Sequence, residues 1–177
     1  FTTSNWATAQ TITVTGVDDS LQDGDITTTL TATASNTGGY AGTETATTTV
    51  KNTDNETAGI TIAKTGTTDG SGNLLTTEAG GTSTFTVVLD AQPTANVTVT
   101  LTGTDSTEHS LSSSSLTFTA ANWNTPQTVT VSGVDDTTLD GDIITTLTAI
   151  ASNTGGYAGE TATTTVITTD NETAGIT

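Results

Sequence analysis

The sequence predicts an all-β protein built from β-sandwich modules in tandem. Two features support this prediction: apolar and polar residues alternate in short runs, and one long segment occurs twice. In addition, no run shows the apolar spacing of three and four residues that marks an amphipathic helix. The 177 residues carry a formal charge of −17, and 31% of them are hydrophobic. Such a composition also occurs in disordered chains, but the alternating runs indicate a folded one.

Alternation of period two predicts half-buried strands. It is clear in residues 84–89, where Phe85, Val87 and Leu89 share one face. Threonine suits the opposite, solvent face, because its β-branched side chain favours extended backbone. We expect strands near residues 59–64, 75–79, 82–90, 96–103, 115–119, 127–133, 143–151 and 160–168. The residues expected to face inward in the strand from 143 are Ile143, Thr145, Leu147, Ala149 and Ala151.

The repeat relates residues 1–61 to residues 118–177, and 47 of the 60 aligned positions are identical. The offset of 117 is too long for a solenoid coil and fits one Greek-key β-sandwich domain. We therefore expect residues 1–57 to be the C-terminal half of one module, with roughly three strands. Residues 58–173 would form a complete module, and residues 174–177 would begin a third. The half-module alone would expose its core, so we expect upstream sequence or a neighbouring subunit to complete it.

Acidic residues gather in one loop of each copy, "GVDDSLQDGD" at 16–25 and "GVDDTTLDGD" at 133–142. Two carboxylates ~4 Å apart repel by about 1 kcal/mol in water and by about 4 kcal/mol at an effective dielectric of 20, so a cation would hold such a loop together. Ca²⁺ takes about six to eight oxygen ligands from flexible loops, whereas Mg²⁺ prefers a stricter octahedron. The alternative is a solvated turn, since Asp and Gly are ordinary turn residues. All four acids recur while the residues between them change, which favours calcium.

The order of motifs resembles the Calx-β repeats of large bacterial surface proteins and of the sodium/calcium exchanger. The matching pieces are "TTEAGGTSTFTVVL", "SLTFTAANWNTPQTVTVSGVDD", "DGD" and "TTDNE". The resemblance covers residues 58–173 and the half-module 1–57. It implies an Ig-like sandwich that binds Ca²⁺ where the last strand leaves the domain.

The resemblance also implies a set of carboxylate ligands. In the complete module these are Glu78, Glu108, Asp135, Asp136, Asp140, Asp170 and Glu172, with Asp105 as an alternative to Glu108. In the first copy they are Asp18, Asp19, Asp23, Asp54 and Glu56, and no residue of that copy matches Glu78. Two departures from the family pattern would weaken the site: Asp140 stands where a Glu is usual, and Asn171 replaces an acid.

These observations predict a structural, non-enzymatic role. Calcium at the joint would tie the loops of one domain to the linker and stiffen the hinge. We expect an extracellular filament, stalk or adhesin on a bacterial surface, whose partners are neighbouring repeats or fibre subunits. Extracellular calcium modules bind with a Kd of ~10⁻⁴–10⁻³ M. With two lysines and no arginine, nucleic acid is excluded as a partner, and no apolar run predicts membrane insertion.

A binding module for polysaccharides is the alternative function, with Trp123 and Tyr157 as sugar contacts. We nevertheless expect Trp123 to pack on the sandwich edge and Tyr157 to anchor a loop. We expect His109, the single histidine, to be a surface residue. Paired carboxylates of a glycosidase would face a cleft with aromatic platforms, whereas these acids crowd one loop, so no residue set predicts an enzyme.

Overall fold

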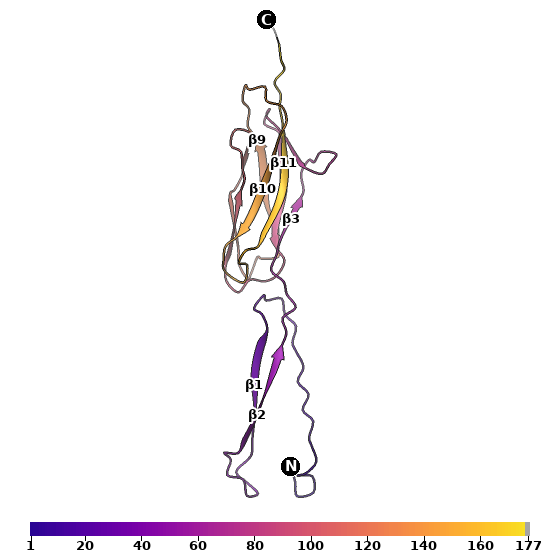
Figure 1. Ribbon diagram of the computed structural model, residues 1–177, viewed down its shortest axis with the longest axis vertical. Helices are drawn as coiled ribbons and strands as arrows, with labels where there is room; N and C mark the ends of the chain where they lie inside the picture. Colours follow the sequence, from indigo (N-terminus) through magenta and orange to yellow (C-terminus); the bar gives the residue numbers. More distant parts are fainter. Residues whose placement is uncertain (176–177) are drawn as a thin grey trace. The chain divides into compact units, whose positions relative to one another are not determined.

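The computed structural model describes residues 1–175, and its regular elements in that range are β-strands (Figure 1). The chain divides into two compact units. The first comprises Phe1–Asp19 and Thr27–Asn52, and the second comprises Ser20–Ile26 and the described residues from Thr53 onward. Within the described range no helix is long and apolar enough to span a membrane. The predicted all-β class is confirmed.

The second unit contains a β-sandwich of two sheets. One sheet has the strand order β4-β11-β10-β6-β8, and the other has the order β3-β5-β9-β7. The strands are β3 (Ile60–Lys64), β4 (Leu74–Thr77), β5 (Thr82–Leu89), β6 (Val97–Thr102), β7 (His109–Leu111), β8 (Ser115–Phe118), β9 (Gln127–Gly133), β10 (Ile143–Ala151) and β11 (Thr161–Thr169). The sequence predicted all of these strands except the very short β7.

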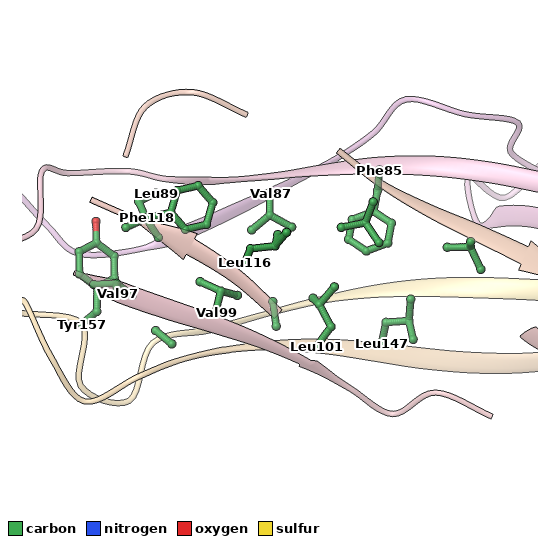
Figure 2. Packing of buried hydrophobic residues seen from close by; sticks show 14 of the residues in the cluster. Phe85, Val87, Leu89, Val97, Val99, Leu101, Leu116, Phe118, Leu147 and Tyr157 are labelled. Atoms are coloured by element: carbon green, nitrogen blue, oxygen red, sulfur yellow. The ribbon is translucent and has the colours of Figure 1, made fainter. Parts of the chain in front are cut away.

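The core lies between the two sheets, where side chains of facing strands point toward one another (Figure 2). In β5 the alternate residues Phe85, Val87 and Leu89 are buried, as the period of two predicted. In β10 the expected inward face is also confirmed, because Leu147 is 1% exposed whereas the outward Ile144 is 66% exposed. The alternation therefore results from burying one face of each sheet.

The strands of the two halves of this module interleave. Strands β9, β10 and β11 come from the second half, residues 118–173. Strand β9 lies between β5 and β7, and the β10–β11 pair lies between β6 and β4. The edge strands β3, β4 and β7 come from the first half, residues 58–117, and β8 spans the boundary. The second half therefore has no sheet edge of its own.

The first unit contains one two-stranded sheet, formed by β1 (Ile26–Thr33) and β2 (Thr45–Asn52). Residues 11–19 form no strand (Figure 1), although residues 10–16 match β9 at five of seven positions. The expectation of roughly three strands is wrong at this segment. A strand needs a hydrogen-bonding neighbour, and the two strands that flank β9 have no counterpart in this unit.

Candidate metal centre

Acidic residues of the complete module converge at one end of the sandwich. Glu78 directly follows β4, and Asp170 directly follows β11. Strands β4 and β11 pair in parallel, with Thr77 opposite Thr169, so both segments leave the sheet at the same end. The backbone N–H of Glu78 donates a hydrogen bond to the carbonyl of Thr169 at 3.1 Å. This pairing fixes two residues far apart in sequence beside each other.

Glu108 and Asp140 reach the same end from the other strands. Glu108 directly precedes β7, and its carbonyl accepts a hydrogen bond from the N–H of Val134 at 2.8 Å, just beyond β9. Asp140 lies in the loop between β9 and β10. Gly133, at the end of β9, packs so closely on the backbone of Thr77 that a Cβ there would lie 2.0 Å from the Thr77 carbonyl oxygen. Glycine therefore permits the close approach of β9 to the segment that carries Glu78.

Two groups of three carboxylates are close enough to hold an ion. Oxygens of Glu78, Asp170 and Glu172 lie within 4.8 Å of one another, and so do oxygens of Glu78, Glu108 and Asp140. Glu78 belongs to both groups. Residues 1–175 contain no further group of three that meets this distance.

Glu78 is the most unusual member of the cluster. Its side chain is 0% exposed, and no N–H or hydroxyl group donates to either carboxylate oxygen, so its polar neighbours are the other acidic side chains of the cluster, such as Glu172. Glu108 is 3% exposed, and its Oε2 also lacks such a donor, as does Oε2 of Glu172. A buried carboxylate is costly unless it is paired or coordinates a metal. The all-oxygen, negatively charged donor set fits a hard cation such as Ca²⁺.

The pKa values of the cluster reflect its excess of negative charge. Contact with the Asp170 side chain raises the pKa of Glu172 to about 7, and burial and Glu78 add to the effect. Burial raises the pKa of Glu108, with further contributions from the charges of Asp140 and Glu78. The pKa of Asp170 is lowered instead, because the backbone N–H groups of Glu172 and Gly141 donate to it. A cation would stabilise the ionised form of every member.

We expect the melting temperature of the metal-free protein to fall as pH rises from 4.5 to about 7. Glu172 holds its proton more tightly in the folded than in the unfolded state. The resulting stabilisation is complete below the ordinary pKa of 4.5 and is lost as pH rises through about 7. Calorimetry in the presence of a chelator measures this dependence, and Glu172→Gln should weaken it. A melting temperature that rises over this range would contradict the expectation.

Asp170 ties the linker to the acidic loop. Its Oδ2 accepts a hydrogen bond from the N–H of Gly141 at 2.7 Å, and its Oδ1 accepts one from the N–H two residues further on at 2.8 Å. Gly141 has a φ of 80°, which glycine adopts without strain. The first joint repeats this arrangement: Oδ2 of Asp54 accepts from the N–H of Gly24 at 2.6 Å, and Gly24 has a φ of 79°. Both joints therefore share one local structure.

Other predicted ligands lie outside the two groups. The Asp135 side chain accepts a hydrogen bond from Nδ2 of Asn171 at 3.0 Å, and that of Asp136 accepts one from the N–H of Thr138 at 2.6 Å. Asp105, the alternative to Glu108, bonds to the hydroxyl and N–H of Thr107 instead. The ligand roles of Asp135 and Asp136 stay predictions.

The first copy does not reproduce the carboxylate groups of the complete module. Asp23, Asp54 and Glu56 of the second unit belong to neither group found among residues 1–175. Both groups depend on Glu78, and residues 1–57 contain no counterpart of it. Asp18 and Asp19 belong to the first unit. The ligand roles of these five acids stay predictions.

The structure also tests three residues outside the acidic cluster. The expectation that His109 lies on the surface is wrong: it is 1% exposed, because β7 turns it inward like Leu111, two residues later. That alternation is a weak strand signal in the sequence. Tyr157 is 0% exposed, and its hydroxyl donates to the carbonyl of Ala91 at 2.6 Å, which confirms a loop anchor. Trp123 packs against the core, as expected. The Tyr157 ring therefore has no exposed face for a sugar.

Comparisons with known proteins give distant structural likenesses. No family model matches the chain, and no curated protein matches its sequence. The apo-form Calx CBD1 domain is 16% identical with a TM-score of 0.43, over 64% of this chain and 98% of that domain. WR4, an MSP family member from C. elegans, is 8% identical with a TM-score of 0.38, over 55% and 91%. A protein of unknown function from Porphyromonas gingivalis W83 is 15% identical with a TM-score of 0.40, over 63% and 48%. Likenesses this distant do not assign the chain to a family.

Proposed function

We propose that this chain is a structural repeat in which Ca²⁺ fixes the end of each complete module to the linker that follows it. The burial of Glu78, with no N–H or hydroxyl donor to either carboxylate oxygen, at the meeting point of two acidic groups, carries this proposal. The residues that would hold the ion or ions are Glu78, Glu108, Asp140, Asp170 and Glu172. Ca²⁺ is favoured over Mg²⁺ because many protein oxygens are available as ligands. Mg²⁺ usually keeps several of its water ligands instead.

The proposed ion would act by linking four separate parts of the chain. Glu78 comes from the end of β4, Glu108 and Asp140 come from segments around β7 and β10, and Asp170 and Glu172 come from the linker. Without a cation, like charges drive these parts apart. With one, the linker is attached to the sandwich, and its freedom as a hinge falls.

The role that follows is rigid spacing in an extracellular filament, stalk or adhesin of a bacterial surface, with neighbouring repeats as partners. Calcium in extracellular fluids would keep such a site occupied at a Kd of ~10⁻⁴–10⁻³ M. A polysaccharide-binding function is not favoured by the complete module, because Tyr157 is buried.

We expect calcium to raise the melting temperature of the second unit by roughly 8–15 °C. With calcium on the order of 10 mM, about a hundred times a Kd of ~10⁻⁴ M, binding stabilises the folded state by about 2.7 kcal/mol. Thermal unfolding with calcium, with equal magnesium and with chelator measures the shift. Magnesium should give a much smaller one. No shift with calcium would refute the proposal.

The stiffening itself has a separate readout. The chain has no cysteine, so Ala174→Cys allows one nitroxide label to be placed on the linker. Its electron spin resonance spectrum should show slower motion with calcium than with magnesium. A matched label at Ser114→Cys, at an exposed position in the loop between β7 and β8, should be insensitive to calcium. Calcium could raise the melting temperature and leave the mobility of the linker label unchanged. That result would mean that calcium stabilises only the sandwich, and it would refute the role at the joint.

A further inference from the structure

Matching apolar residues have opposite environments in the two copies of the repeat. In the first unit the exposed members, with exposed fractions, are Phe1 (85%), Trp6 (74%), Ile12 (82%), Val14 (51%), Leu30 (37%) and Tyr40 (59%). We call this set the open face. In the complete module the counterparts Phe118, Val129, Val131, Leu147 and Tyr157 are at most 1% exposed, and Trp123 packs against the core. Because the residues are the same or nearly so, their neighbours must cause the difference.

Those neighbours are strands of the first half of the module. Strand β10, the counterpart of β1, borders β6, with Leu101 opposite Ala149. Strand β11, the counterpart of β2, borders β4. Strand β9, the counterpart of residues 10–16, has β5 on one side and β7 on the other. Each second-half strand thus has at least one hydrogen-bonded neighbour among residues 58–117, and its inward side chains pack against that half of the module.

The first unit has none of these neighbours. Strands β1 and β2 form a sheet of two, so each has one edge that no strand covers. All eight residues of β1 are exposed. Residues 11–19 form no strand at all. The open face therefore combines uncovered apolar side chains with unpaired backbone groups, which is the combination that accepts an added strand.

We infer that the open face is a docking surface for the first half of another module of the same repeat, a polypeptide with the strand pattern of residues 58–117. Docking would give residues 10–16 two strand neighbours and would extend the β1–β2 sheet at both edges. Main-chain hydrogen bonds supply affinity, and alternate side chains supply selectivity. The occupant follows from the complete module, where strands of this pattern already cover the same side chains. This inference does not depend on calcium.

The test uses the whole chain with a polypeptide of residues 58–117 as the probe. We expect a one-to-one complex by native mass spectrometry. Hydrogen exchange of residues 10–17 and 27–33 should slow by on the order of a hundredfold or more, because these amides become part of a sheet.

Two variants of neighbouring residues provide a matched control. Leu30→Asp places a charge on the open face, since its counterpart Leu147 is 1% exposed. Thr29→Asp places the same charge on the opposite side of β1, since its counterpart Thr146 is exposed. Leu30→Asp should abolish the slower exchange, whereas Thr29→Asp should keep it. Neither should change the melting of the complete module, which shows that the chain remains folded.

A second arrangement covers the case in which the free probe fails to bind. Residues 58–117 are joined directly before Phe1, so that Phe1 follows the same residues as its counterpart Phe118. Residues 10–17 should then exchange as slowly as residues 127–133. Fast exchange in this joined chain would overturn the inference. Self-association of the original chain that Leu30→Asp abolishes would also overturn it, because the occupant would then be a second intact copy.

Discussion

Glu78→Gln is expected to abolish the calcium-dependent rise in melting temperature and to leave the metal-free protein at least as stable as before. Glu78 belongs to both carboxylate groups, so its loss removes a ligand from each. In the metal-free protein the neutral amide removes one buried acidic group from a cluster with an excess of negative charge. Its NH₂ group can also donate to neighbouring carboxylates. The substitution should therefore remove the calcium response without lowering the stability of the metal-free protein. If Glu78 had only a structural role, its substitution would lower that stability.

The control for this substitution is Glu160→Gln. It changes the net charge by the same amount, but Glu160 precedes β11, at the end of the β10–β11 pair opposite to Asp170. The calcium shift should survive in Glu160→Gln. Calorimetry with calcium and with chelator compares the two variants. A Glu78→Gln protein that keeps its full calcium shift would show that the ion binds elsewhere.

Phe118→Ala is expected to destabilise the complete module by about 3–5 kcal/mol, whereas Phe1→Ala changes stability by less than about 0.5 kcal/mol. Phe118 is 0% exposed and pairs with Val97 in the five-stranded sheet. Its loss leaves a cavity lined by rigid strands. Phe1, its counterpart in the repeat, is 85% exposed, so its side chain buries little apolar surface and its removal leaves no cavity.

Urea unfolding followed by circular dichroism measures both free energies in the same chain. The comparison is unusually well controlled, because the two residues have the same type and a closely related sequence around them. Equal destabilisation by the two substitutions would contradict the environments described for the two copies. An unfolded Phe118→Ala protein would agree with the prediction, and the milder Phe118→Leu would then supply a measurable value.

Local sequence was sufficient to predict most of the sandwich, because each strand buries one face and alternates accordingly. It was insufficient wherever structure depends on distant partners. Residues 10–16 carry the strand pattern of β9, yet they form no strand without neighbours. Strand β7 has only three residues, so its alternation was too weak a signal to predict a strand, and the burial of His109 was missed.

The candidate site shows the same division. The clustering of Asp135, Asp136 and Asp140 is visible in a single stretch of sequence. The position of Glu78 beside Glu172 depends instead on the parallel pairing of β4 with β11, which residue spacing alone does not show. That Glu108 and not Asp105 joins the cluster likewise depends on strand pairing, because Val134, just beyond β9, bonds to the backbone of Glu108. The resemblance to Calx-β repeats suggested these residues, and the strand pairing explains how they meet.

Interleaving of the two halves also dictates the order of events during synthesis. The ribosome makes residues 58–117 first, so the outer strands of the module exist before the central strands that join them. Until β9, β10 and β11 emerge, β4 and β7 have no strand partner, and the β3–β5 and β6–β8 pairs are not yet joined into the finished sheets. Long-range pairing of this kind slows folding and prolongs exposure to aggregation. The net charge of −17 and the threonines on the strand faces should keep the partly folded chain soluble and reduce its aggregation during this interval.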